Sequence, residues 1–177
     1  MQSFTLRQAT KDDYPGIYVL LRKAFKDDEN SAHNEAEIVA GLLREESFLA
    51  EFSIVAVMDD QIIGYILLSP IEIINGPEVN KALALAPLAV HPSLQRMGIG
   101  AALIEKVHEL AEEKGHSLIL VTGHDTYYPR FGYREAKNYS ISVPFNIPSK
   151  FVMVKFLNGY SGKAISGKVK YPAPFYY

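Results

Sequence analysis

Residues 81–122 hold the pattern that most constrains the fold: two apolar runs separated by a helical repeat. The run "KALALAPLAV" is apolar at nearly every position, as a central strand buried on both faces would be. Apolar residues then recur at helical spacing over 99–114, and Gly115 follows where a glycine commonly ends a helix. "SLILVT" is a second buried strand. We therefore expect a right-handed strand-helix-strand crossover between two parallel strands.

The rest of the chain adds strands and two helices to this unit. "SFTLRQ" alternates as a strand does, and apolar stripes in residues 17–25 and in "AHNEAEIVAGLLREE" predict two helices. "FLAEFSIVAVM" and "IIGYILLSPIEII" predict a hairpin, and "ISVPF" and "FVMVKFL" predict two further strands. The fold class is therefore α/β (α+β mixed), with helices packed on a mixed sheet.

The size and composition indicate a single domain with an appended segment. The chain has 177 residues and 48% hydrophobic content, enough for a sizeable core. We predict one domain over residues 1–157 and a tail over 158–177. That tail holds Tyr160, Tyr171, Phe175, Tyr176 and Tyr177, too many aromatics for a solvated linker. We expect the tail to pack on the domain, to roof a site or to form a homodimer contact.

Charge and cysteine content exclude several classes of function. A formal charge of −2 gives no basic footprint, so we expect no nucleic-acid partner. The absence of cysteine excludes disulfides, thiolate metal sites and a cysteine acyl intermediate. We find no metal-ligand cluster, no secretory signal and no uninterrupted apolar run of about 18 residues that would span a membrane. The simplest expectation is a cytoplasmic protein without a metal.

Two glycines open the helix of the crossover directly after the first strand. A helix N-terminus carries unpaired N–H groups and partial positive charge, and glycine lets an anion approach its backbone. We therefore expect residues 95–101 to cradle an anion, and a pyrophosphate above all. Neither common nucleotide motif fits, because Leu103 replaces the third glycine of the dinucleotide fingerprint and Ala101 replaces the P-loop lysine.

Two segments carry a resemblance to a known family. "LAVHPSLQRMGIGAALI" resembles the acetyl-CoA-binding signature of the GNAT acetyltransferase superfamily, and "YYPRFGY" resembles that superfamily's second motif. The chain is most similar to the bacterial YhbS-like branch. The resemblance covers roughly residues 3–135. It implies a GNAT fold, whose mostly antiparallel sheet splays between its fourth and fifth strands, and an N-acetyltransferase with acetyl-CoA (coenzyme A) as co-substrate.

The resemblance also implies which residues hold the coenzyme. The pantetheine arm would lie along the splayed strand at Leu88, Ala89 and Val90. The pyrophosphate would sit on the loop formed by Gln95, Arg96, Met97, Gly98, Ile99, Gly100 and Ala101. Tyr127, Tyr128, Arg130 and Phe131 of the second motif would pack around the coenzyme.

The same resemblance implies direct attack by an amine, with Tyr128 protonating the departing thiolate. Residues 81–90 contain no Asp or Glu, so the strand acid that some GNAT enzymes use as base is missing. His124, Glu35 or a chain of water molecules would then take the proton from the amine. The acceptor would be a small-molecule or peptide amine. Two alternatives stay open: a non-catalytic acetyl-CoA sensor or scaffold, and an unrelated nucleotide-binding α/β protein.

Overall fold

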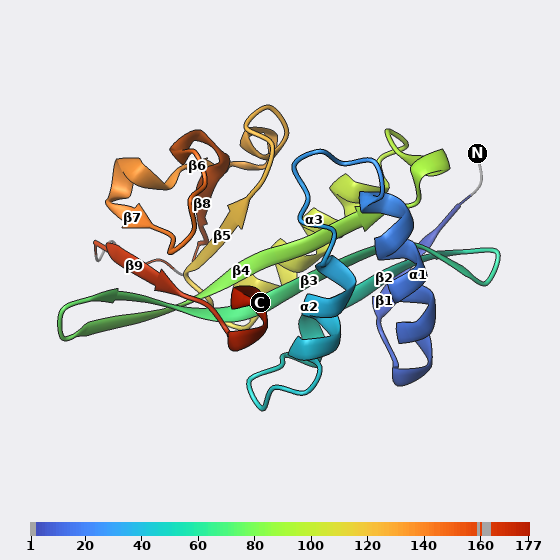
Figure 1. Ribbon diagram of the computed structural model, residues 1–177, viewed down its shortest axis with the longest axis horizontal. Helices are drawn as coiled ribbons and strands as arrows, with labels where there is room; N and C mark the ends of the chain where they lie inside the picture. Colours follow the sequence, from blue (N-terminus) through green and yellow to red (C-terminus); the bar gives the residue numbers. More distant parts are fainter. Residues whose placement is uncertain (1–2, 159, 161–163) are drawn as a thin grey trace.

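The computed structural model describes residues 3–158, 160 and 164–177. Within these residues nine strands form one sheet, in the order β1-β2-β3-β4-β5-β8-β6, with β9 joined to β3 and β7 joined to β9 (Figure 1). The strands are β1 (Thr5–Gln8), β2 (Ser53–Met58), β3 (Gln61–Asn75), β4 (Glu78–Val90), β5 (Leu118–Thr122), β6 (Arg134–Glu135), β7 (Ile141–Ser142), β8 (Val152–Phe156) and β9 (Gly167–Lys170). The α-helices are α1 (Tyr14–Phe25), α2 (Glu35–Leu42) and α3 (Ile99–Glu113).

The sheet is mixed, as the element order predicts, and mostly antiparallel, as the family resemblance implies. The β4–β5 and β7–β9 pairs are parallel, and the other pairs are antiparallel. Because α3 connects β4 to β5, the predicted strand-helix-strand unit is confirmed. The predicted hairpin corresponds to β2 and β3, and β3 then turns at Gly76 and Pro77 into β4.

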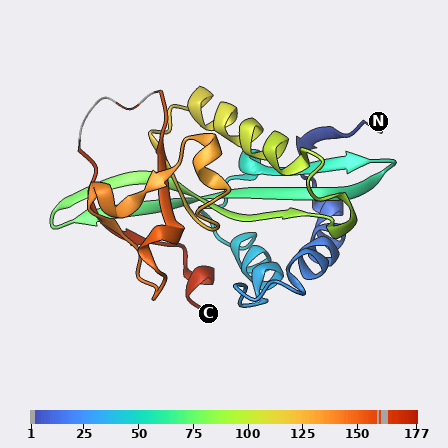
Figure 2. The same cartoon turned by 90° about the horizontal axis from the view of Figure 1, so that it is seen from above.

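The helices cover opposite faces of the sheet. Figure 2 shows α1 and α2 on one side of the strands and α3 on the other. Each helix buries one apolar stripe, as a 3.6-residue repeat requires. The α1–α2 face includes Ile17, Leu21, Val39, Leu67 and Ala89; the α3 face includes Leu103, Ile104, Val107, Ile66 and Leu83.

The C-terminal segment returns to the sheet and then to α2. β9 pairs with β3 through Ile73 and Val169, and a 3-10 turn, η7 (Ala173–Tyr176), lies against α2. A Cβ on Gly41 of α2 would lie 2.9 Å from the Pro174 ring. Residues 159 and 161–163 of the predicted tail lie outside the described residues, and the domain boundary at residue 157 stays a prediction.

Two elements differ in length from the pattern in the sequence. The strand predicted from "ISVPF" is paired only at Ile141 and Ser142, because Pro144 has no N–H to donate to a ladder. The second helix ends at Leu42, although the segment "AHNEAEIVAGLLREE" that predicts it continues for a few residues beyond that position. Element ends are the part that hydrophobic periodicity determines least well.

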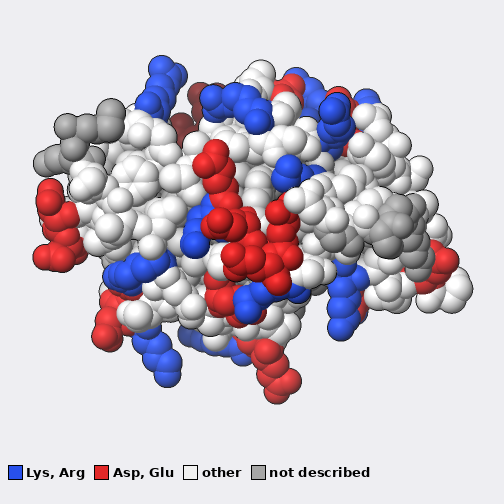
Figure 3. All heavy atoms as spheres, turned by 180° about the vertical axis from the view of Figure 1, so that it is seen from behind, with Lys and Arg blue, Asp and Glu red and all other residues white. Residues whose placement is uncertain are grey.

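Charge on the molecular surface is unevenly spread. Acidic side chains gather in the middle of the rear face (Figure 3), the face on which α3 exposes Glu105, Glu109 and Glu113. No helix among the described residues has both the length and the apolar character that crossing a bilayer needs. Nor do those residues contain a group of three or more His, Cys, Asp or Glu side chains arranged to hold a metal ion.

Candidate active site

The glycine loop, residues 95–101, opens directly into the first turn of α3. Gly98 is the residue before the helix and has a φ of 84°, a left-handed conformation that favours glycine. No side chain caps α3, and its first intrahelical hydrogen bond runs from Ala102 N to Gly98 O at 3.0 Å. The N–H groups of residues 99–101 therefore have no acceptor within the helix. They form a set of donors suited to an anion.

Beside this loop, β4 has an open backbone edge. β4 pairs with β3 up to Val90, but on its other side it pairs with β5 only at Leu83, Ala84 and Leu85. Residues 86–90, which we call the open edge, therefore lack a strand partner on the β5 side. Gln95 Nε2 donates to Val90 O at 3.4 Å, so one carbonyl of the open edge is partly satisfied from the glycine loop. The remaining edge can accept an extended ligand that pairs with backbone groups.

The open edge and the glycine loop lie in contact. An ideal Cβ on Gly100 would lie 3.7 Å from Val90 Cγ2 and 4.0 Å from Leu88 Cδ2. Leu88 and Val90 therefore face α3, whereas Ala89 packs in the core on the α1–α2 face. Ala89 could meet a ligand only through its backbone.

Tyr127 closes the third side of this region. Its hydroxyl would lie 2.9 Å from a Cβ on Gly100, so the phenol rests against the first turn of α3. The Arg130 guanidinium carbon lies 4.5 Å from the centre of the Tyr127 ring, and Arg130 Nε donates to Tyr127 O at 3.3 Å. The Phe131 ring stands edge-on to Tyr127 at 5.2 Å. These contacts place a cation and an aromatic wall beside the helix N-terminus.

Tyr128 is held more deeply than its neighbour. Its side chain is 8% exposed and packs edge-on against Tyr133 at 5.6 Å. A Cβ on Gly123 would lie 2.4 Å from the Tyr128 ring, so only glycine fits at the end of β5 beside it. Gly123 was not among the predicted site residues, although a glycine directly after a buried strand is a signal of close approach.

The Tyr128 hydroxyl makes no hydrogen bond with the described residues. Burial of the ring raises the pKa of Tyr128 well above the usual value for tyrosine. The phenol therefore stays protonated, and remains a donor, throughout the physiological range.

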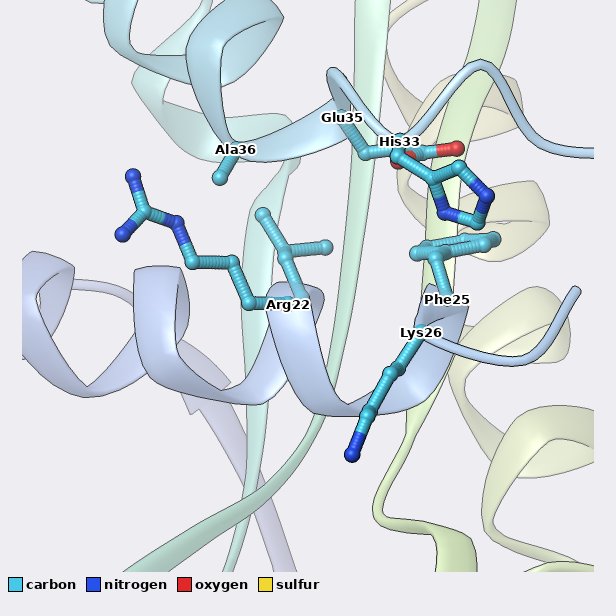
Figure 4. A pocket seen from close by; sticks show the side chains of 7 residues that line it. Arg22, Phe25, Lys26, His33, Glu35 and Ala36 are labelled. Atoms are coloured by element: carbon cyan, nitrogen blue, oxygen red, sulfur yellow. The ribbon is translucent and has the colours of Figure 1, made fainter.

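The two predicted base residues lie on different segments. His124 is exposed, and its backbone carbonyl accepts from the N–H groups of Tyr127 and Tyr128 at 3.2 and 3.4 Å. Glu35 begins α2, and its carboxylate accepts a short hydrogen bond from the Ser31 hydroxyl. Figure 4 shows Glu35 at the rim of a pocket between α1 and α2. His124 thus shapes the turn that carries both tyrosines, while Glu35 faces a pocket.

The other predicted loop residues present different groups. The Met97 side chain is 57% exposed, and Gln95 and Arg96 are exposed as well. The Ile99 side chain is 3% exposed and packs in the α3 core, so only its N–H can face a ligand. Ala101 is partly buried in the first turn of α3.

Known proteins resemble this chain in sequence. A model of the acetyltransferase (GNAT) family matches residues 14–133. The uncharacterized N-acetyltransferase YjhQ of Escherichia coli K12 is 32% identical over 148 residues, covering 83% of this chain and 79% of YjhQ. The uncharacterized N-acetyltransferase YhbS of the same strain is 29% identical over 164 residues, covering 92% and 93% of the two chains.

Solved structures agree over the whole chain. The crystal structure of Escherichia coli YhbS in complex with CoA superposes with a TM-score of 0.86 at 27% identity, covering 100% of this chain and 94% of YhbS. A GNAT family acetyltransferase from Brucella melitensis in complex with acetyl-CoA superposes with a TM-score of 0.80 at 26% identity, covering 99% of both chains. With the strand order, the open edge and the glycine loop in place, these matches show that the chain belongs to the GNAT acetyltransferase family.

Proposed function

We propose that this protein is an N-acetyltransferase that moves the acetyl group of acetyl-CoA to a primary amine by direct attack. The observation that carries the proposal is the meeting of the open edge of β4 with the uncapped first turn of α3. One side offers an extended row of backbone groups and the other a cluster of N–H donors. A pantetheine arm ending in a pyrophosphate needs both.

The described residues fit such a coenzyme. The N–H groups of residues 99–101 would hold the pyrophosphate, with Arg96 and Arg130 as nearby cations without a carboxylate partner in the described part of the chain. The open edge would pair with the amide groups of pantetheine. The structures of YhbS with CoA and of the Brucella protein with acetyl-CoA support this assignment.

The bound coenzyme would supply a thioester whose carbonyl an amine can attack. The new C–N bond forms as the C–S bond breaks, and the departing sulfur needs a proton. Tyr128 fits that role, because its ring is fixed by packing, while its hydroxyl stays protonated and has no hydrogen-bond partner among the described residues. Proton donation by Tyr128 is completed when the phenol recovers a proton from solvent.

The attacking amine must lose a proton on the other side of the reaction. The pocket between α1 and α2 supports Glu35 as the group that meets the ammonium and takes this proton. His124 and a water chain are the alternatives, and Glu35→Gln separates them. If Glu35 is the base, kcat falls about 10²–10⁴-fold in the variant; an unchanged kcat assigns the proton to His124 or to water.

Calorimetry and a thiol-release assay test the proposed function. Acetyl-CoA should bind to the purified protein far more tightly than ATP or NAD, and free CoA thiol should appear only when an amine is added. Tight acetyl-CoA binding without turnover across a broad amine panel would favour the sensor or scaffold. Preferential binding of ATP or NAD would overturn the assignment.

A further inference from the structure

We propose that the acceptor is a small amine that also carries an anionic group, a carboxylate or a phosphate. Arg22 of α1 and Lys26, which caps α1, would recognise this group. The inference rests on the proposed function, because it names the acceptor for the same reaction. It starts from the pocket between α1 and α2, which has a volume of about 330 Å³ (Figure 4). A pocket of this size suits an amino-acid-sized molecule.

The floor of this pocket connects it to the strand that carries the open edge. Leu21 of α1 and Ala36 of α2 line the pocket and are both buried. They belong to the same packed cluster as Ala89 of β4, whose neighbours Leu88 and Val90 face the glycine loop. The pocket therefore lies on the α1–α2 side of the sheet, opposite the side covered by α3 (Figure 2). Phe25 adds an aromatic wall, so the body of the ligand would be apolar.

A hydrogen-bonded loop fixes the single carboxylate that lines the pocket. Ser31 Oγ accepts from His33 N at 2.8 Å while its hydroxyl donates to the Glu35 carboxylate. His33 has a φ of 58°, so the backbone turns sharply here. Figure 4 places the His33 ring beside Phe25, with the Glu35 carboxylate next to them. This arrangement presents a preorganised acceptor for an ammonium group.

Two cations lie on the other side of the same pocket. Arg22 lies in the last turn of α1, and Lys26 is the residue that caps this helix; both line the pocket, and their four-residue spacing puts them on one side of the helix. Arg22 forms an ion pair of 3.1 Å with Glu37, but both side chains are largely exposed, so the pair is easily exchanged. Lys26 has no ion pair with a described residue. Both cations are therefore available to an incoming anion.

The charges that line the pocket thus define an amphoteric ligand. One carboxylate would hold the ammonium, and two cations would hold an anionic group. Asp27, Asp28 and Glu29 follow Lys26 in the chain, but they do not line the pocket. At physiological ionic strength the field of exposed charges is largely screened beyond about 8 Å. Direct contact with the lining residues then decides which amine binds. A polyamine would bind more weakly, because it would place its extra positive charge beside Arg22 and Lys26.

Matched pairs of amines test this inference by binding and by turnover. The protein is saturated with CoA, and calorimetry then compares leucine with 3-methylbutylamine, phosphoethanolamine with ethanolamine, and both pairs with spermidine. We expect the anionic member of at least one pair to bind at least tenfold more tightly than its neutral partner. The pair that shows the difference identifies the anion as a carboxylate or a phosphate. With acetyl-CoA, the same member should have the higher kcat/KM.

A double variant ties the selectivity to the two cations. Arg22→Gln/Lys26→Gln should raise the Kd and KM of the anionic amine at least tenfold and change those of its neutral partner less than twofold. Lys23→Gln is the matched control, because Lys23 lies on the same helix, is exposed and does not line the pocket. Three results would each overturn the inference. They are equal or absent binding of both members of each pair, tighter binding of spermidine than of the anionic amines, and equal effects of the double variant and the control. Failure of CoA itself to bind would instead contradict the proposed function.

Discussion

The replacement Gly100→Val probes the contact between the glycine loop and the open edge. A side chain at this position points toward Tyr127, Val90 and Leu88, with distances of 2.9, 3.7 and 4.0 Å from the ideal Cβ to their nearest atoms. The nearest of these atoms is the Tyr127 hydroxyl, which is the far end of a rotatable side chain. The phenol can therefore move aside, but the branched side chain then occupies the space in front of the N–H donors.

Folding stability and coenzyme affinity should respond differently to this change. A glycine inside a helix costs about 1 kcal/mol relative to alanine, so a side chain here recovers part of what displacing Tyr127 costs. We expect the free energy of unfolding to change by less than about 1 kcal/mol. Loss of one hydrogen bond to a charged phosphate is worth about 1.5–3 kcal/mol. Affinity for acetyl-CoA should therefore fall about tenfold to about 150-fold.

Calorimetry with acetyl-CoA and urea unfolding measure the two quantities on the same preparation. Glu105→Val is the control for the β-branched side chain, because Glu105 lies on the exposed face of α3. Gly100→Val/Tyr127→Phe separates the two causes of weaker binding, since phenylalanine removes the crowded hydroxyl. We expect the double variant to bind as weakly as Gly100→Val. Wild-type affinity in a folded Gly100→Val protein would refute the phosphate site at α3.

Three further predictions concern single side chains. Tyr128→Phe should lower kcat about 10²–10⁴-fold and leave the affinity for acetyl-CoA unchanged, whereas Tyr127→Phe should leave kcat within tenfold of the wild-type value. Equal effects of the two variants on kcat in stopped-flow assays would show that Tyr128 is not the proton donor. The Arg7 guanidinium, which donates to Asp13 at 2.6 and 2.9 Å, holds the pKa of that carboxyl well below its usual value. The stabilisation from this ion pair is therefore complete above about pH 3.9, the pKa of Asp in the unfolded chain, and is lost as the pH falls below that value. Asp13→Asn should lower the free energy of unfolding by about 2 kcal/mol at pH 7, and urea unfolding should show a smaller difference between variant and wild type at pH 3. Equal stability of the two proteins at pH 7 would show that the ion pair is unimportant. Burial, with Lys155 nearby, lowers the pKa of His108 to about 4. The free energy of unfolding should therefore decrease as the pH falls from about 6.5 toward 4, because the unfolded chain takes up a proton at His108 first. An NMR titration of the His108 imidazole with a midpoint near 6.5 would contradict the lowered pKa.

Much of the fold was predictable because it is encoded locally. The apolar repeat of α3, the run of β4 and the glycines between them are properties of neighbouring residues, and each element took the predicted type. The site was predictable to the extent that the backbone makes it: a glycine before a helix leaves N–H donors free whatever packs nearby. Non-local pairings, such as β9 against β3, could not be read from periodicity, which carries no information about partners.

Local patterns in the sequence are enough to predict the strand-helix-strand unit, the position of the glycine loop and the family to which the chain belongs. The resemblance also implied that β4 and β5 separate, but the tertiary structure set the residue, Leu85, after which they do, because this depends on where two distant strands stop pairing. The tertiary structure also decided how two adjacent tyrosines differ. The turn over residues 124–132 places Tyr127 against Gly100 and Tyr128 against Gly123, although the two residues have the same side chain and neighbouring positions. The pocket between α1 and α2 arises in the same way, since only packing brings Arg22, Lys26 and Glu35 to the lining of one pocket.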